Sequence, residues 1–252
     1  MFAESNDGMH AVQGTTQKKG LLDRFLELYR KGLLDYYNQP DNSDVHPDHA
    51  DHGFLERYVN PTDTVLEVGC GRGNFTYDLA RQARRVYAID PVRRYVDEIE
   101  SGMSAAGIRN VTLHTAGAES LDIIPGRYDR VFFGRVLSQL PGPRRTLELA
   151  KNKLSYDGSI IVMESEMCPC NEAYPNHLTI AEKACKEAGC SFEEVDKALG
   201  IPFSITIDWV KKTADGTGLK VSKSEKLGSC SLGNDFQNFI AELRPTRPVK
   251  GE

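Results

Sequence analysis

One short segment constrains the fold more than any other part of this 252-residue chain. It reads VLEVGCGRGNFTYDLA, in which an apolar strand predicted over residues 64–68 leads into Gly69, Gly71 and Gly73 and then into a helix predicted over residues 74–83. Glycine allows a sharp turn and lets bare backbone N–H groups approach a ligand. The segment therefore predicts a strand, a ligand-binding turn and a helix in succession.

Strands and helices alternate after this segment. Further strands are predicted over residues 85–89, 111–114, 130–133, 159–163, 219–227 and 236–244, and helices over residues 92–106, 143–154 and 207–213. Such alternation is typical of a parallel sheet with helices on both faces. The last strand is expected to pair antiparallel beside residues 219–227. The sequence thus predicts an α/β protein with a doubly wound, mostly parallel seven-stranded sheet.

The remaining residues predict three additional parts. Residues 1–18 are polar and non-periodic, which favours a disordered tail, whereas apolar residues recur at helical spacing over about 20–37. We expect residues 19–59 to form an N-terminal helical lid and residues 60–252 to form the main domain. Residues 165–203 interrupt the alternation after the fifth strand and are interpreted as an insertion over the active site.

The second strand ends in Asp90, where a carboxylate is placed to accept the hydroxyls of a ribose. In the dinucleotide fingerprint the third glycine follows the second by three residues. Here Asn74 takes that place and the glycines run G-x-G-x-G. This spacing argues against NAD, while an adenosine-type ligand fits both the turn and Asp90.

Five motifs now stand in order along the chain: VLEVGCGRG, VYAIDP, AGAESL, YDRVFFGRVLSQL and LSYDGSIIVME. Together they resemble the class I S-adenosylmethionine-dependent methyltransferases over residues 60–165, and more loosely over residues 205–244. The resemblance implies a Rossmann-like fold, S-adenosylmethionine as cofactor with S-adenosylhomocysteine as product, and transfer of a methyl group by in-line displacement.

By position, the resemblance also implies the residues around the cofactor. Glu67 and the glycine turn would hold the methionine part, and Asp90 the ribose. Glu119 would lie at the adenine edge, because the acidic residue that the family often has just before the alanine is replaced here by Gly117. Arg135 would face the cofactor or an anionic substrate, unless it turns to solvent. The implied set is Glu67, Gly69, Cys70, Gly71, Asn74, Asp90, Pro91, Ala118, Glu119, Gly134 and Arg135.

A general base is needed only if the acceptor is an alcohol, a phenol or a protonated amine. Our catalytic candidates are His49 and His52, in the run HPDHADH, and Tyr37, at the end of the first helix. The histidine run is also consistent with a solvated loop whose polar residues cap a helix. Tyr37 could equally pack in the core or form part of a lid. Further titratable groups, which no motif singles out, are Tyr36, His46, Glu164, Glu166 and His177.

No metal site is predicted. The helical spacing of the three histidines in HPDHADH spreads them too widely for a tight triad. The four cysteines of the 165–203 insertion match no common zinc motif.

Charge and hydropathy restrict the partners. Lys and Arg number 31 against 36 Asp and Glu, a net charge of −5, so the basic excess usual in proteins that bind phosphate backbones is lacking. No apolar run approaches the roughly 20 residues of a membrane span, and the polar N-terminus does not resemble a signal peptide. We therefore expect a cytoplasmic protein without a membrane partner; a homodimer stays open.

The leading hypothesis is a small-molecule methyltransferase, because a lid and an insertion would enclose a pocket at the edge of the sheet. An RNA adenine methyltransferase is the alternative, since GRGNFTYDLARQARRVYAID is similar to that branch, and a local basic cluster is formed by Arg81, Arg84, Arg85, Arg93 and Arg94. That family's Asn-Leu-Pro-Tyr is replaced here by FFGRVLSQLP, which disfavours nucleic acid. A third reading is a non-catalytic binding or partner subunit that keeps the fold.

Overall fold

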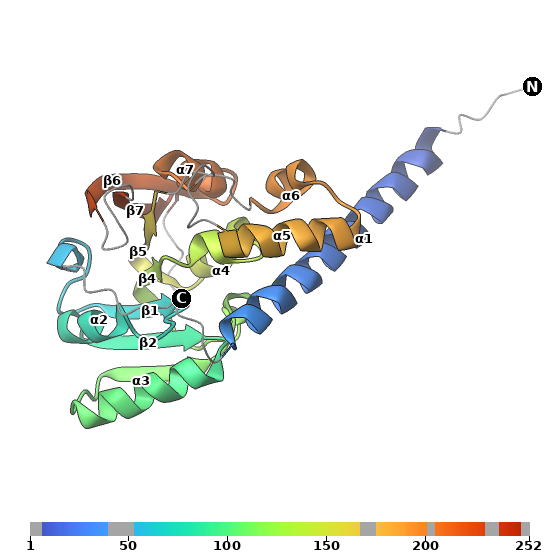
Figure 1. Cartoon of the computed structure of the whole chain (residues 1–252). Helices are drawn as coiled ribbons and strands as arrows, with labels where there is room; N and C mark the ends of the chain where they lie inside the picture. Colours follow the sequence, from blue (N-terminus) through green and yellow to red (C-terminus); the bar gives the residue numbers. More distant parts are fainter. Residues whose placement is uncertain (1–6, 40–52, 167–174, 201–204, 230–236, 248–252) are drawn as a thin grey trace, which may run out of the picture.

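The computed structural model describes residues 7–39, 53–166, 175–200, 205–229 and 237–247. Within them the chain forms one seven-stranded sheet with the order β3-β2-β1-β4-β5-β7-β6 (Figure 1). The strands are β1 (Thr64–Val68), β2 (Arg85–Asp90), β3 (Val111–Thr115), β4 (Tyr128–Gly134), β5 (Leu154–Ser165), β6 (Leu219–Ser229) and β7 (Gln237–Pro245). All seven predicted strands are confirmed.

Helices cover both faces of the sheet. The α-helices are α1 (Asp7–Tyr37), α2 (Thr76–Gln82), α3 (Arg93–Ala105), α4 (Pro143–Lys151), α5 (Pro175–Ala188), α6 (Phe192–Leu199) and α7 (Ile207–Ala214), and the short 3-10 helices are η1 (Gly53–Arg57), η2 (Ala118–Ser120) and η3 (Leu137–Gln139). On one face α2 and α3 bury Leu79 and Ile99 against the strands. On the other face α4 and α7 bury Leu147 and Trp209. The doubly wound α/β architecture is thus confirmed.

The order of the strands determines where a ligand can bind. Strands β1 to β5 are parallel, and the chain moves from β1 outward to β2 and β3 before it crosses back to β4 on the other side of β1. Such a reversal leaves a crevice at the carboxyl ends of the two central strands, here β1 and β4. Strand β7 pairs antiparallel with β6, as predicted, and also with β5, so that it lies between them.

Helix α1 is longer than the sequence indicated. Asp7–Tyr37 is one helix, so residues 7–18 are helical and the prediction of a disordered tail was wrong for them. Apolar periodicity, on which the prediction rested, marks only the part of a helix that packs, whereas this helix continues beyond the packed part because no proline interrupts it. In Figure 1 its blue N-terminal part extends away from the sheet.

The packed part of α1 lies against the residues that follow β5. Phe25 and Tyr29 are fully buried in a cluster with Ala181 and Ala184 of α5 and Val195 of α6. Within the described residues, the segment predicted as an insertion therefore forms two helices that hold α1. The first helix and the insertion make one structural unit.

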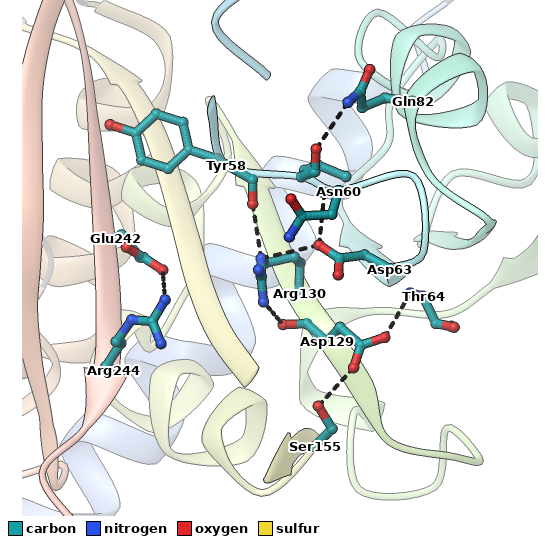
Figure 2. Close-up of polar contacts among 11 residues, drawn as sticks. Tyr58, Asn60, Asp63, Thr64, Gln82, Asp129, Arg130, Ser155, Glu242 and Arg244 are labelled. Carbon is teal, nitrogen blue, oxygen red and sulfur yellow. Dashed lines mark hydrogen bonds and ion pairs between the residues drawn. The ribbon is translucent and has the colours of Figure 1, made fainter. Parts of the chain in front are cut away.

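A polar network at the amino ends of β1 and β4 attaches the residues before β1 to the sheet (Figure 2). Arg130 Nε donates to the Tyr58 carbonyl at 2.8 Å and lies 3.3 Å from the Asp63 carboxylate. Asp129 accepts from the Thr64 amide at 2.8 Å and from the Ser155 hydroxyl at 2.9 Å. These contacts lie at the end of the sheet opposite to the crevice.

Among the described residues, no helix combines the length and the apolar character needed to cross a bilayer.

Candidate functional site

The glycine turn follows β1 at the carboxyl edge of the sheet. Gly69, Gly71 and Gly73 have φ values of 74°, 52° and 88°, a region that side chains disfavour. A Cβ on Gly69 would lie 2.4 Å from the Val136 side chain. Glycine is therefore required both for the turn and for its close contact with the residues after β4.

The N–H groups of this turn are used differently from our expectation. The amides of Gly69 and Cys70 donate to the Ile89 carbonyl at 2.8 and 3.1 Å, and the Gly73 amide donates to Cys70 at 2.8 Å. These bonds fasten the turn to β2 instead of presenting N–H groups to a ligand. What the glycines offer is a bare backbone surface that a ligand can approach closely.

Asp90 ends β2 beside this turn. Its Oδ2 accepts from the Gly71 amide at 2.9 Å, and its Oδ1 accepts from the Val92 amide at 2.8 Å. Burial raises the pKa of the Asp90 carboxyl, and these two backbone N–H groups oppose the rise. An ionised carboxylate has about four acceptor sites, so each oxygen can still accept a hydroxyl from a bound ligand.

Glu67 lies inside the crevice, near the end of β1, with a side chain that is 1% exposed. Among the described residues its Oε2 has no hydrogen-bond partner. Burial raises the pKa of Glu67 to about 8; the Thr76 hydroxyl lowers it and the Asp90 charge adds to the rise. A buried acceptor without a partner is unfavourable. The Thr76 hydroxyl, at the start of α2, lies near this carboxyl, and a cationic or hydroxyl group of a ligand would satisfy the remaining oxygen.

The residues after β4 form the opposite wall. Arg135 has a left-handed backbone with φ 56°, which is rare for a residue with a side chain. Its amide donates to the Met163 carbonyl at 2.7 Å, and its guanidinium reaches the Asn238 side-chain oxygen in β7 at 3.5 Å. Arg135 is half-buried and points along the sheet edge toward β7.

Glu164, near the end of β5, lies on the same wall with a side chain that is 2% exposed. Its Oε1 accepts from the Ser138 amide at 3.0 Å and its Oε2 from the Ser138 hydroxyl at 3.3 Å. Burial raises the pKa of Glu164 to about 7, while the Ser138 bonds and the nearby Arg135 charge oppose the rise.

The end of α1 lies over the crevice and contacts both walls. The Tyr37 hydroxyl donates to the Gln139 side chain, while the Tyr37 carbonyl accepts from the Tyr95 hydroxyl at 2.9 Å. Burial raises the pKa of Tyr37, and so do Tyr95, Asp90 and Glu164. The carboxylates of β2 and β5 thus both lie near this one hydroxyl.

The contacts of Tyr37 predict that its hydroxyl fastens the end of α1. Tyr37→Phe keeps the ring and removes one buried hydrogen bond, so we expect a loss of about 0.5–1.5 kcal/mol of local stability. Amide hydrogen exchange of residues 33–38 should become several-fold faster. Tyr156→Phe is the control, because the Tyr156 side chain is 62% exposed on β5. Unchanged exchange in the Tyr37 variant would contradict this role.

The remaining predicted residues differ in placement. The Cys70 side chain is buried in the core, and Ala118 is buried in η2. Pro91 is exposed and Asn74 half-buried. Glu119 is exposed and pairs with Arg30 of α1 at 3.4 Å, so α1 also contacts the side of the site expected to receive adenine.

Two catalytic candidates, His49 and His52, lie outside the described residues, and so do His46, Cys168 and Cys170. Glu166 pairs with Lys226 at 3.0 Å outside the crevice. Gly134 ends β4, where a Cβ would clash with the Phe75 ring at 2.4 Å. In the part of the chain that the structure covers, no three His, Cys, Asp or Glu side chains gather as a metal site.

Four residues of the site carried no signal in the sequence. Ser138, Gln139 and Asn238 are ordinary polar residues in their segments, and Tyr95 reads as a core position of an amphipathic helix. Each acquires its role from a partner far along the chain, as Gln139 does from Tyr37. Glu164 had been named as a titratable candidate, but nothing in the sequence distinguished it from Glu166.

Comparison with known proteins supports the same interpretation. A family model described as "Methyltransferase domain" matches residues 65–158. A protein-L-isoaspartate O-methyltransferase of Jannaschia sp. (strain CCS1) is 36% identical over 85 residues, which are 34% of this chain and 38% of that protein. A probable ribosomal RNA small subunit methyltransferase A of Methanosarcina mazei is 35% identical over 99 residues, 36% of this chain and 32% of that protein.

Similarity to a solved structure extends over more of the chain. A SAM-dependent methyltransferase from Aquifex aeolicus superposes with a TM-score of 0.53 at 17% identity, covering 84% of this chain and 96% of that one. At this identity the likeness concerns the fold, and the chain spans less than two fifths of the two curated relatives. The sheet thus has the fold of this methyltransferase structure, and residues 65–158 match the methyltransferase-domain model.

Proposed function

We propose that this protein is an S-adenosylmethionine-dependent methyltransferase that transfers a methyl group to a small molecule in the cytoplasm. The observation that carries the proposal is the pair of buried carboxylates, Glu67 and Asp90, on either side of the glycine turn. One has acceptor sites to spare for a ribose, and the other has an oxygen without a partner among the described residues.

The residues present fit this ligand. S-adenosylmethionine carries an ammonium group and a sulfonium at one end and two ribose hydroxyls toward the other. Glu67 would face the cationic methionine part, Asp90 would accept the ribose hydroxyls, and the bare backbone of Gly69–Gly73 would allow close approach. When bound, the ligand supplies a methyl group on a positively charged sulfur, which is ready for displacement.

The contribution of the chain is to orient the reactants and exclude water. The Tyr37 hydroxyl donates to the Gln139 side chain, and Arg30 of α1 pairs with Glu119 in η2. The end of α1 thereby acts as a lid over the carboxyl edge of the sheet. Holding two reactants in line within such a pocket contributes on the order of 7–11 kcal/mol to lowering the barrier.

A small acceptor is favoured because the lid limits access and because the local arginines are neutralised. Arg81, Arg93 and Arg94 pair with Asp78, Asp97 and Glu98 on their own helices. Three of the five arginines in the basic cluster are therefore compensated by acidic neighbours, while Arg84 donates to the Thr64 hydroxyl and Arg85 lies over the Tyr87 ring. Exposed pairs of this kind leave little net field for a phosphate backbone.

RNA remains the second candidate acceptor because of one finding. The relative from Methanosarcina mazei, 35% identical over 99 residues, is named as a probable ribosomal RNA methyltransferase. Incubating the protein with methyl-labelled S-adenosylmethionine and either total RNA or a small-metabolite extract separates the two classes. We expect label in the low-mass fraction; label confined to RNA would overturn our assignment of the acceptor.

The proposed cofactor is tested by isothermal titration with S-adenosylmethionine, S-adenosylhomocysteine and NAD. We expect micromolar binding of the first two and none of NAD, because the glycine spacing does not suit a dinucleotide. Absence of binding by both sulfur ligands would reject the proposed function. Binding without any methyl transfer to small molecules or RNA would favour a non-catalytic partner subunit.

A further inference from the structure

Glu164 is a buried carboxylate that the proposed cofactor contacts leave unused. It lies near the end of β5, beyond β4 and on the opposite side of β1 from Asp90. From β2 to β5 there are three strand spacings, roughly 14 Å between backbones. A ligand whose ribose lies at Asp90 and whose methionine part lies over β1 and β4 would present its methyl group toward β5.

The end of α1 lies between the segment that holds Glu164 and the helix that follows Asp90. The Tyr37 hydroxyl donates to Gln139, the neighbour of Ser138, and Ser138 binds Glu164. The Tyr37 carbonyl accepts from the hydroxyl of Tyr95, near the start of α3, at 2.9 Å. The charges of Asp90 and Glu164 both raise the pKa of the Tyr37 hydroxyl, in agreement with this position.

The surroundings of Glu164 suit a proton acceptor. Ser138 occupies one acceptor site on each oxygen, at 3.0 and 3.3 Å, and a carboxylate has about four such sites. Arg135 supplies a nearby positive charge, and its guanidinium is held toward Asn238 in β7. The backbone N–H of Leu137 also stabilises the charged carboxylate. These bonds and the Arg135 charge keep the carboxylate in place and still leave about one acceptor site for a ligand.

Asn238 and Ser165 extend this wall with further polar atoms. The Ser165 hydroxyl donates to the Asn238 oxygen at 2.8 Å, and both side chains are buried. A wall made of carboxylate, guanidinium, amide and hydroxyl groups matches an acceptor that forms hydrogen bonds. These groups bond to one another, and a polar acceptor can add hydrogen bonds to them that an apolar acceptor cannot.

We propose that Glu164 faces the acceptor and receives its proton, which makes the acceptor a small molecule with a hydroxyl or protonated amine. In this step the acceptor's O–H or N–H bond breaks and its proton passes to the Glu164 carboxylate. The acceptor's oxygen or nitrogen forms a bond to the methyl carbon, and the methyl–sulfur bond breaks with its electron pair kept on sulfur. The inference rests on the proposed function of the chain.

Of the two described acidic residues at the end of β5, Glu164 and Glu166, only Glu164 is buried and bonded to the segment after β4. Burial brings its pKa to about 7, so that at neutral pH the carboxylate is present and can also hold a proton. Glu166, two residues along the chain, is tied to Lys226 outside the crevice. Glu67, on β1, is already assigned to the methionine part of the proposed ligand.

Sinefungin tests the placement without knowledge of the acceptor. In this analogue of S-adenosylmethionine an amine on carbon replaces the methyl-bearing sulfonium, so a positive N–H donor occupies the place of the transferred methyl group. If Glu164 faces that place, sinefungin should bind the wild-type protein about tenfold more tightly than S-adenosylhomocysteine. Affinities of both ligands are measured by isothermal titration on the full chain.

The variants separate this role from a structural one. Glu164→Gln keeps the size of the side chain, and we expect it to abolish the preference for sinefungin while S-adenosylhomocysteine binds as before. Glu166→Gln is the matched control and should keep the preference. A merely structural Glu164, needed to hold Ser138, would weaken both ligands together and leave their ratio unchanged.

Two results would overturn the inference: equal binding of sinefungin and S-adenosylhomocysteine by the wild-type protein, or an unchanged preference in Glu164→Gln. Failure of the proposed function is distinguishable, because the wild-type protein would then bind neither ligand.

Discussion

Replacing Asp90 by alanine is expected to weaken the binding of S-adenosylmethionine by about 1–3 kcal/mol, or roughly 5- to 150-fold. Two effects combine. The ligand loses a charged acceptor for its ribose hydroxyls, and the amides of Gly71 and Val92 lose the oxygens that they bind at 2.9 and 2.8 Å. The glycine turn would then be less fixed before the ligand arrives.

Calorimetry on a pair of further variants separates these effects. Asp90→Asn keeps one acceptor oxygen and the size of the side chain, and should give an intermediate loss. Asp97→Asn removes an exposed carboxylate from α3, where it pairs with Arg93 at 3.1 Å, and should leave the affinity unchanged. Wild-type affinity in Asp90→Ala would mean that the ribose does not bind at the end of β2.

Replacing Glu67 by glutamine is expected to change stability and affinity in opposite directions. The carboxylate is buried, one oxygen lacks a partner within the described residues, and its pKa is raised to about 8. Glutamine removes the need to bury a charge, so we expect a gain of about 1–2 kcal/mol in the free energy of unfolding at pH 8. Affinity for the cationic ligand should fall roughly tenfold or more.

The dependence on pH has a definite sign. The pKa of Glu67 is about 8 in the folded protein and 4.5 in its reference state. Between pH 4.5 and pH 8 the folded protein holds a proton on Glu67 that the unfolded chain releases. The contribution of Glu67 to stability is therefore complete below pH 4.5 and is lost as the pH rises to 8. The advantage of the glutamine variant should therefore grow from pH 5 to pH 8.

Thermal unfolding at pH 5 and pH 8 measures the gain in stability of the Glu67→Gln variant. Isothermal titration between pH 6 and pH 8 measures its loss of affinity for S-adenosylmethionine. The affinity of the wild-type protein should rise with pH more steeply than that of the variant, because a cationic ligand binds the ionised carboxylate of Glu67. Any titration of the ligand itself affects both proteins equally. Equal slopes would show that Glu67 does not meet the cationic end. Glu98→Gln, an exposed change on α3, is the control.

The fold was largely predictable because its signals are local. Strands β1, β2 and β4 are short, largely apolar runs; β1 leads into Gly69, β2 ends at Asp90 and β4 ends at Gly134. The glycine turn identifies the first ligand-binding loop. The N-terminal part of α1 was not predictable in this way. Its helix does not depend on burying a regular apolar stripe, so periodicity could not reveal it.

The site was predictable only on the side that the glycine turn and Asp90 define. Those residues lie close together in sequence and act through backbone geometry. The other wall is assembled from Ser138, Glu164 and Asn238, which come from separate strands and loops. No local pattern marks such residues, because burial and long-range pairing give them their properties. Tyr37 was a candidate, but its partner Gln139 was found only in the structure.

The position of β7 has a consequence for how the protein is made. Strand β7 follows β6 along the chain but lies between β5 and β6 in the sheet. During synthesis, β6 therefore has no neighbour to pair with, and the edge of β5 stays open, until β7 has left the ribosome. Asn238, which the Arg135 guanidinium reaches, arrives with that strand. A nascent chain can therefore form the glycine turn and place Asp90 beside it well before Asn238 completes the opposite wall.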